Sequence, residues 1–570
     1  MRMRLQRLLQ GSCLQAIQAV KGKIRRVKLY GGRCRWLKAA MIFALAGCGH
    51  QQPAGDSAAS ALIVAQTREP ISLNPILEGG YVSNELGSLC FSYLLRIDDR
   101  MRLEPEVARE VPSLQNGGIS RDGMTITYRL RRGVRWDDGV PLTSADVVFS
   151  FNAIMNPRNL VAAGRIGYDR IAWVRAIDPY TVRVRLARPF SALLSYFFAS
   201  DENYAILPAH VLARYSDVNH VPFDGRPICS GPYSIAGWQR GDHVTFVANP
   251  IYWRGRPKIG RIVLRFVPNQ QTAVDQLRTG EAGAYFDADA SVFPQLSSLG
   301  GITLARTPTG DFATMQFNTT ASPTNDVKVR RAIVLASDFP VIVPKVTQGA
   351  YTFEHATRGW FGWAYAPSVH IPAYDPRAAV ALLDDAGWKR GADGVRSKDG
   401  RKLQVQIIAR NDEPALIATA VYEQQALAQI GIGVSIKTYI PSQFVEVTGP
   451  ADQGRFNILM ERQLANLDPD ASNWVACDER EPHGNNYPRY CRLEVDRLDA
   501  DALRTFDRKR RLVDYAAVQR LIASDLPIIV LWEADELDAY TKRLHGFSSS
   551  YQSPFWNVAA WSLSASRSTR

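Results

Sequence analysis

The sequence lacks the short motifs that identify most catalytic and cofactor-binding sites. It contains no HExxH pair, no GxSxG elbow, no GxxxxGK[ST] loop, no GxGxxG and no CxxC. Its eight histidines are scattered, and no two of them are four residues apart. These absences argue against a zinc protease, an α/β-hydrolase, a nucleotide-binding domain and a thioredoxin-like site. We therefore expect no catalytic residues, no metal site and no cofactor.

The body of the chain lacks an excess of positive charge, although the formal net charge of the whole chain is +13. Residues 1–47 hold eleven Lys and Arg and no Asp or Glu, so that the remaining residues carry a net charge of only +2. A protein that binds nucleic acid needs a basic face to neutralise phosphates. A nearly neutral body without a basic stripe predicts no nucleic-acid partner.

The basic segment ends in an apolar run that is typical of an export signal. Lys38 precedes the apolar residues 39–47, which are far fewer than the roughly 20 needed to cross a bilayer. The sequence LAGC at 45–48 is similar to a bacterial lipobox. It predicts a lipoprotein signal peptide over 1–47, a lipid-modified Cys48 and a flexible tether over 48–60. The alternative is a plain secretory signal in which Cys48 is incidental.

Export and lipid modification would leave four cysteines in an oxidising compartment: Cys90, Cys229, Cys477 and Cys491. Cys477 and Cys491 enclose a short polar loop, and we predict a disulfide between them. In the chain-entropy model, closing a loop of that size is worth about 3 kcal/mol. For Cys90 and Cys229 two alternatives stay open, a disulfide assigned by elimination or two buried free thiols.

Helix-like and strand-like segments alternate along the chain without long repeats, which indicates an α/β fold. At 570 residues the chain is too long for one core, so several structural units are expected. Between residues 401 and 440 a strand, a long helix and another strand follow in order, which predicts parallel pairing in a second α/β lobe. Asp326 and Asp375 are placed to cap helices. A late apolar strand in "DLPIIVLWEADELDAY" returns the chain towards the first lobe.

The stretch "VRWDDGVPLTSADVVFSF" at 134–151 admits two interpretations. Asp137 and Asp138 beside Trp136 resemble a pair of carboxylates for general acid/base chemistry. Alternatively, the acidic pair belongs to a turn, and Thr143 and Asp146 form a capping box at the start of a helix. The second interpretation gives every residue a structural role, and we prefer it.

The same stretch also carries a family resemblance. With "LEPEVAREVP" before it, it resembles the signature region of the bacterial extracellular solute-binding proteins of family 5, the oligopeptide-, dipeptide- and nickel-type receptors of ABC importers. Further matching segments follow in the family's order from about residue 62 to 545. They include "SLNPI", "CSGPYSI", "NPIYWRGRPKIGRIVLRFVPN", "DVKVRRAIVLASD", "YDPRAAVALLDDAGW" and "LAQIGIGVSIK".

The resemblance implies a periplasmic-binding-protein fold of type II, with two lobes that close on a ligand by hinge motion. The implied domains are the first lobe at 61–103 and 229–317, an extra subdomain at 104–228, the second lobe at 318–544 and a return segment at 545–570. The chain would be a periplasmic, lipid-anchored monomer that delivers a peptide or related solute to ABC permease subunits. The alternatives are a sensor or chaperone lipoprotein on the same fold and, with no readable nucleophile, a hydrolase.

The resemblance also suggests ligand-binding residues. In peptide-binding members an aspartate in a second-lobe loop pairs with the α-amino group of the ligand. When the loop is aligned on Pro469, that position falls on Ala465. A shifted register places Asp468 there and aligns Arg462 with a family arginine, but Pro469 then no longer fits. Ala465 would remove the amine anchor, which leaves room for a modified peptide, an opine-like molecule or a metal chelate.

Three more residues are ligand-binding candidates by the same resemblance. Glu78 and Tyr81 follow "SLNP" in a stretch similar to one that faces the ligand from the first lobe. Asn318 lies in "MQFNTT", at the expected crossing between the lobes. The alternative for each is a hinge or loop residue that satisfies backbone groups.

Overall fold

The computed structural model describes residues 61–565, except 79, 163, 166, 201–203, 308, 354–357, 445–448, 481–483 and 551. The predicted signal peptide, the tether and Cys48 lie outside the described residues.

A seven-stranded mixed sheet, in the order β11-β20-β10-β1-β9-β8-β7, forms the centre of the first lobe. Its strands are β1 (Ala61–Gln66), β7 (Tyr233–Gln239), β8 (His243–Ala248), β9 (Arg261–Phe266), β10 (Ala284–Tyr285), β11 (Ile302–Thr307) and β20 (Glu536–Thr541). The lobe also contains α2 (Gly80–Cys90), α6 (Gln270–Thr279) and α7 (Phe293–Ser297). β1 is parallel to β9 and β10, so the carboxyl ends of these three strands lie on one edge of the sheet.

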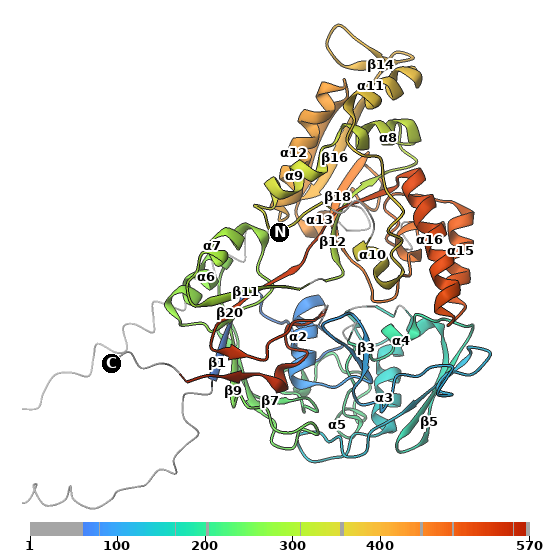
Figure 1. The fold of residues 1–570 in the computed structure, drawn as a ribbon. Coiled ribbons are helices and arrows are strands. Elements are labelled where there is room, and N and C mark those ends of the chain that lie inside the picture. The colour runs from blue at the N-terminus through green and yellow to red at the C-terminus, as the bar shows by residue number, and fades with distance from the viewer. Residues whose placement is uncertain are drawn as a thin grey trace, which may run out of the picture. The chain divides into compact units, whose positions relative to one another are not determined.

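A five-stranded sheet, in the order β17-β16-β18-β12-β19, forms the centre of the second lobe (Figure 1). Its strands are β12 (Asp311–Phe317), β16 (Gln404–Arg410), β17 (Gly433–Tyr439), β18 (Ile458–Leu464) and β19 (Ile528–Glu533). Its helices include α8 (Val327–Ala336), α9 (Phe339–Val346), α11 (Pro376–Asp385) and α12 (Pro414–Gln429). β16 is parallel to β17, which α12 connects to it, and the predicted parallel pairing is therefore confirmed.

The region predicted as an extra subdomain contains a three-stranded antiparallel sheet, in the order β4-β6-β5. Its elements are β4 (Thr125–Arg129), α3 (Ser144–Met155), η2 (Tyr168–Arg170), β5 (Ile171–Asp178), β6 (Thr181–Leu186), α4 (Leu193–Tyr196), α5 (Ala209–Leu212) and η3 (Pro222–Asp224). Buried residues of this sheet share one apolar cluster with buried residues of β1, β8 and β9. The subdomain is thus packed as part of the first lobe.

The remaining elements are short, apart from two long helices of the second lobe. They are β2 (Leu95–Ile97), β3 (Leu103–Pro105), η4 (Ala290–Val292), α10 (Arg358–Phe361), η5 (Gly362–Ala364), β13 (Lys389–Arg390), β14 (Arg396–Lys398), β15 (Arg401–Lys402), α13 (Pro441–Phe444), α14 (Ser472–Val475), α15 (Leu493–Leu503), α16 (Arg508–Asp525), β21 (Leu544–His545), η6 (Val558–Ala560) and β22 (Ser562–Leu563). α15 packs on α16. In the described part of the chain, no helix is both long and apolar enough to cross a membrane.

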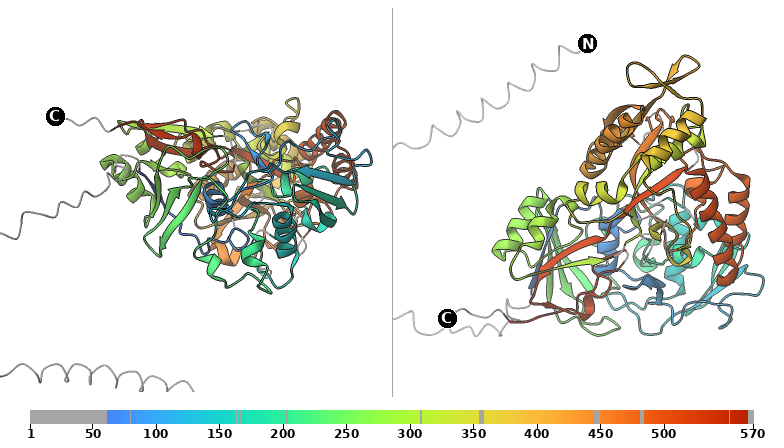
Figure 2. Two further views of the ribbon diagram at one scale, coloured as in Figure 1. Left: turned by 90° about the horizontal axis from the view of Figure 1, so that it is seen from below. Right: turned by 45° about the horizontal axis from the view of Figure 1, so that its top comes forward.

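The chain passes between the two sheets twice, from β11 to β12 and from β19 to β20. Both views of Figure 2 show the red C-terminal strands beside green strands of the first lobe. The crossings lie earlier than the expected boundaries after residues 317 and 544, because all of β12 belongs to the second sheet and all of β20 to the first. An apolar strand pattern does not show which of the two sheets the strand will join. The crossings in the structure therefore differ from the boundaries expected from the sequence.

The capping box is confirmed. Thr143 Oγ1 accepts from the N–H of Ala145 at 3.3 Å, and Asp146 accepts from the N–H of Thr143 at 2.8 Å. The adjacent acidic pair forms a turn, in which Asp138 accepts from the N–H of Val140 at 3.0 Å and Gly139 has a φ of +92°. These carboxylates therefore have structural roles, as preferred from the sequence. Asp326 and Asp375 also cap α8 and α11.

Candidate functional site

The carboxyl ends of parallel strands in the two lobes face one another. β1 and β10 end at Gln66 and Tyr285 in the first lobe, and β16 and β18 end at Arg410 and Leu464 in the second. Both crossings between the sheets occur at these ends. In open α/β sheets, ligands bind outside the carboxyl ends of the strands. The residues that follow these strands are therefore the first candidates for a binding site.

A network of charges spans the two lobes at this place. Arg462 in β18 donates from Nε to Asp311 of β12 at 3.1 Å, and its Nη2 contacts the same carboxylate. Burial disfavours the charge on Arg462, but Asp311, Glu413 and Asp287 outweigh it and raise the pKa of the guanidinium. Asp287 belongs to the first lobe and lies 3.9 Å from Arg68. Arg462 thus stands at the interface of the lobes, but it is already paired with Asp311.

The first lobe contributes four carboxyl groups to this region, which we call the first-lobe acid cluster: Glu85, Asp287, Glu536 and Asp538. Glu85 in α2 and Asp538 in β20 are almost completely buried. Burial raises the pKa of Glu85 well above its usual value, and the neighbouring Asp287 raises it further. Burial also raises the pKa of Asp538 to about 7.

Ala465 lies in an apolar environment. It is 1% exposed and packs in a cluster with Phe312, Trp360 and Trp474. Its backbone N–H donates to the carbonyl of Gly310 at 2.8 Å. Ala465 thus presents a methyl group against aromatic rings and offers no carboxylate to an amine.

Asp468, the candidate in the alternative register, is held in a buried ion pair. Its Oδ1 accepts from Nη2 of Arg511 at 2.5 Å, and both side chains are less than a tenth exposed. Arg511 also donates to Tyr515 Oη at 3.1 Å. Neither register therefore places an unpaired carboxylate in this loop.

Glu78 and Asn318 bind backbone groups. Glu78 accepts from the N–H groups of Ile71 and Ser72, at 2.5 and 3.1 Å. Asn318 donates to the carbonyl of Gly454 at 3.0 Å and accepts from the N–H of Thr320 at 3.0 Å. Tyr81 belongs to α2, but its side chain lies outside the described residues. Both described candidates thus hold loop backbone in place. The expected position of Asn318 at the crossing between the lobes is wrong, because Asn318 follows the end of β12 and the crossing precedes its start.

Two cavities lie between the extra subdomain and the second lobe. The larger has a volume of about 900 Å³ and is lined by residues that include Arg170, Tyr196, Asn466, Asp470, Cys477 and Asp499. The smaller has a volume of about 590 Å³ and is lined by residues that include Arg102, Leu194, Trp363, Asn466 and Phe506. Asn466 stands between the two and donates from Nδ2 to Tyr196 Oη. The loop after β18 thus contributes to the walls of both cavities.

Asp470 and Asp499 form a carboxyl pair in the wall of the larger cavity. Asp499 is 3% exposed and accepts from the N–H of Ala471 at 3.1 Å. Burial raises the pKa of both groups, and for Asp499 the adjacent Asp470 raises it further. Burial thus disfavours the charged form of both carboxyl groups in this wall.

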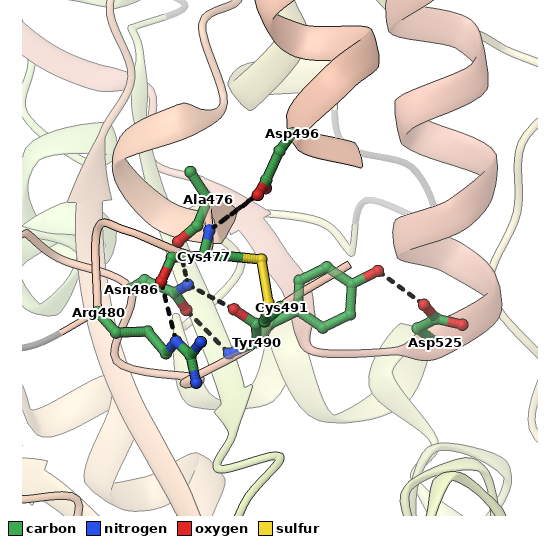
Figure 3. Close-up of a disulfide and its surroundings, with 8 residues drawn as sticks. All are labelled: Ala476, Cys477, Arg480, Asn486, Tyr490, Cys491, Asp496 and Asp525. Atoms are coloured by element: carbon green, nitrogen blue, oxygen red, sulfur yellow. Dashed lines mark hydrogen bonds between the residues drawn. A yellow bond between two sulfur atoms is a disulfide. The ribbon is translucent and has the colours of Figure 1, made fainter. Parts of the chain in front are cut away.

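A disulfide between Cys477 and Cys491 closes the loop that forms another wall of the larger cavity (Figure 3). Inside this loop, Asn486 donates from Nδ2 to the carbonyls of Ala476 and Tyr490, at 2.8 and 2.7 Å. Tyr490 Oη donates to Asp525 at 2.6 Å and so ties the loop to α16. The covalent bridge and these hydrogen bonds fix the position of the cavity wall.

A second disulfide joins Cys90, at the end of α2, to Cys229, before β7. It links the first part of the first lobe to the part that follows the extra subdomain. The Cys229 thiol is therefore not free to act as a nucleophile.

The sequence did not single out Arg68, Glu85, Asp287 or Asp538. The segment "ELDAY" gave one usable signal, because strand alternation puts Glu536 and Asp538 on the same face of an otherwise apolar strand. Carboxylates are rarely buried without a partner, so such a pair indicates a binding or structural site.

Comparison with known proteins was consistent across sequence and structure. A model of the family "Bacterial extracellular solute-binding proteins, family 5 Middle" matches residues 102–481. The oligopeptide-binding protein AppA of Bacillus subtilis is 25% identical over 536 residues, which cover 93% of this chain and 95% of AppA. The glutathione-binding protein GsiB of Escherichia coli K12 is 28% identical over 496 residues, which cover 86% of this chain and 92% of GsiB.

Two solved structures superimpose on this chain over most of its length. NikZ from Campylobacter jejuni in complex with Ni(L-His) superimposes with a TM-score of 0.74 at 26% identity, covering 88% of this chain and 99% of NikZ. AppA from Bacillus subtilis in complex with a nonapeptide gives a TM-score of 0.71 at 24% identity, covering 88% of this chain and 99% of AppA.

Proposed function

Because the chain belongs to family 5 of the bacterial extracellular solute-binding proteins, it is the substrate-binding component of an ABC importer, and we propose that it captures a peptide or peptide-like solute between its lobes. Proteins of this family bind solutes for transport and are not enzymes. The expected fold class, absence of catalysis and role in transport are confirmed by the family match and the structural similarity.

The observation that carries the ligand proposal is the meeting of the two carboxyl edges around Asp287, Arg462 and Asp311. In the part of the chain that the structure describes, two crossings join the sheets, at β11–β12 and β19–β20. Two connections of this kind permit hinge closure on a solute. Relatives named as oligopeptide-binding and glutathione-binding proteins support a peptide-like solute.

We further propose that position 465 does not hold the amino terminus of the solute. Ala465 is buried among aromatic rings, and Asp468 is paired with Arg511. The absence of an unpaired carboxylate at Ala465 and Asp468 also favours a second class of ligand that needs no amine anchor. This class comprises an amine-modified peptide, an opine-like molecule and a metal chelate. The structure of NikZ with Ni(L-His) supports the chelate.

The cellular setting is proposed from the leader sequence. The family places the protein outside the cytoplasm. We propose a monomer that is anchored through a lipid on Cys48, carried on the tether 48–60, and that delivers its solute to permease subunits in the inner membrane. Copurification with such a permease would distinguish transport from a sensor or chaperone role.

A thermal-shift screen tests the proposed function. The probes are peptides of two to five residues, the same peptides N-acetylated, Ni(L-His) and opine-like amino acid conjugates. A ligand at one hundred times its Kd stabilises the native state by about 2.7 kcal/mol, so binding raises the melting temperature. We expect stabilisation by peptide-type probes with no change in their mass after incubation. Stabilisation by none of the peptide-type probes, or turnover of any probe, would contradict the proposal.

A further inference from the structure

Four arginines line the smaller of the two cavities between the lobes. Arg100 and Arg102 belong to the turn between β2 and β3 in the first lobe, and Arg508 and Arg511 belong to α16 in the second. Among the described residues of the lining, Asp468 is the one carboxylate. The cavity therefore presents a net positive charge, to which both lobes contribute, and such a lining attracts an anion.

Two of these arginines are paired and two are not. Arg102 and Arg511 are each in an ion pair with an aspartate, at 2.6 and 2.5 Å. Arg100 and Arg508 form no ion pair within the part of the chain that the structure describes. Their charges are therefore available to an anionic group that enters the cavity.

Arg511 has a free donor although it is buried. The residue is 6% exposed, and its Nη2 donates to Asp468 and to Tyr515 Oη. Its Nε–H has no acceptor within the described residues. A buried N–H without an acceptor is costly, so an oxygen atom supplied by a ligand would stabilise this position.

Trp363 of η5 contacts both guanidinium groups of α16. The Cζ atoms of Arg508 and Arg511 lie 4.5 and 5.0 Å from the centroid of its ring. Cation–π contacts of this kind restrict the side chains, so less freedom is lost when they bind an anion. The N–H donors of a guanidinium match the two oxygens of a carboxylate, which favours a carboxylate as the anionic group.

Between the arginines the lining is mostly apolar. The apolar side chains are those of Met101, Leu103, Leu194, Trp363, Leu467 and Phe506. An inorganic anion would make no use of these walls, whereas an apolar group would be removed from water by them. The lining thus fits an organic anion in which an apolar group adjoins the carboxylate, and the volume of about 590 Å³ is large enough for an amino acid residue.

We propose that the smaller cavity binds a carboxylate of the solute together with the apolar group next to it, as at the C-terminus of a peptide that ends in an apolar residue. Arg508 and Arg511 bind the carboxylate, and the apolar walls bind the side chain beside it. This assignment rests on the proposed function and specifies the class of its substrate. Because position 465 offers no carboxylate to an amine, the peptide is recognised at its opposite end.

Calorimetry with three acetylated tripeptides tests the assignment. The first is Ala-Ala-Leu with a free C-terminal carboxylate, the second is its C-terminal amide, and the third is Ala-Ala-Ser with a free carboxylate. We expect the first probe to bind at least tenfold more tightly than either of the others. We expect Arg508→Gln to weaken the first probe at least tenfold and to leave the amide unchanged. Arg508 is exposed at the start of α16, so its replacement should not prevent folding.

The matched control is Lys509→Gln, which removes the next exposed cation of α16, outside the described lining of the cavity, and it should leave the affinities unchanged. Equal binding of the amide or of the serine probe would overturn the assignment while leaving the proposed function intact. Equal weakening by Arg508→Gln and Lys509→Gln would also overturn it, because the carboxylate would then respond only to the overall charge of the helix. Binding of no peptide, in this experiment and in the thermal-shift screen, would overturn both the assignment and the proposed function.

Discussion

Asn466, in the loop after β18, donates a hydrogen bond to Tyr196 at the end of α4 and so links the second lobe to the extra subdomain. Close to this contact, the backbone N–H of Ser191 donates to the carbonyl of Leu503 at 2.8 Å. These bonds join surfaces that hinge opening would separate. The structure therefore represents the two lobes in contact at this side of the larger cavity.

Asn466→Ala should weaken the contact between the lobes. A hydrogen bond of this kind contributes about 1 kcal/mol net, so we expect a comparable shift of the hinge equilibrium towards the open form. Small-angle X-ray scattering of the ligand-free protein should show a larger radius of gyration than for the wild type. Tyr196→Phe should have the same effect, and the double variant should exceed neither single variant. Additive effects would mean that the two side chains act separately.

Asp468→Asn should reduce stability without removing ligand binding. The change leaves the Arg511 guanidinium buried without its charge partner, which typically costs 3–5 kcal/mol. Urea unfolding would measure this loss, and calorimetry with a peptide identified by the screen would measure affinity. The control is Asp501→Asn in the exposed pair with Arg497, where about 1 kcal/mol or less is expected. A large loss of affinity with unchanged stability would instead identify Asp468 as the ligand anchor.

Glu423 should make the second lobe less stable as the pH rises. Burial raises the pKa of Glu423 from 4.5 to about 7, opposed by the hydrogen bond that Ser337 donates at 2.6 Å. The folded state therefore binds this proton more tightly than the unfolded state. The resulting stability is fully present below pH 4.5 and is lost as the pH rises through 7.

Glu423→Gln keeps the shape of the protonated side chain and removes this dependence. At pH 8 the variant should be more stable than the wild type by on the order of 3 kcal/mol, and near pH 4.5 the two should be equal. Urea midpoints across this range would measure the difference. The exposed Glu494→Gln should show no such trend. A difference that is independent of pH would rule out titration of Glu423 as the cause.

Replacing both Cys477 and Cys491 by alanine should destabilise the wall of the larger cavity. The bridge encloses a short loop with a sequence separation of 14, for which loop closure is worth about 3 kcal/mol. The pair Cys90 and Cys229, with a separation of 139, should cost about 5 kcal/mol by the same relation. Urea unfolding of the two double variants would compare them. Free thiols at 477 and 491 in non-reducing peptide mapping of exported protein would contradict the first prediction.

Local features could be predicted because neighbouring residues determine them. Thr143 and Asp146 lie three positions apart, so the capping box is specified by a few consecutive residues. The caps at Asp326 and Asp375 depend on equally short segments. The candidate site is different, because side-chain environment decides its chemistry. The sequence placed Ala465 at the expected anchor position, but it could not show the rings of Phe312 and Trp360 around it.

The sequence by itself determined the family, the α/β class and the parallel pairing in the second lobe. Only the tertiary structure decided that β12 joins the second sheet and β20 the first, because strand pairing is settled by long-range packing. It also decided that Glu85, Asp287 and Asp538, which are far apart in the chain, interact with one another. The physical reason is that the pairing of strands far apart in the sequence determines which charged side chains are buried and desolvated. A local sequence pattern contains no information on that desolvation.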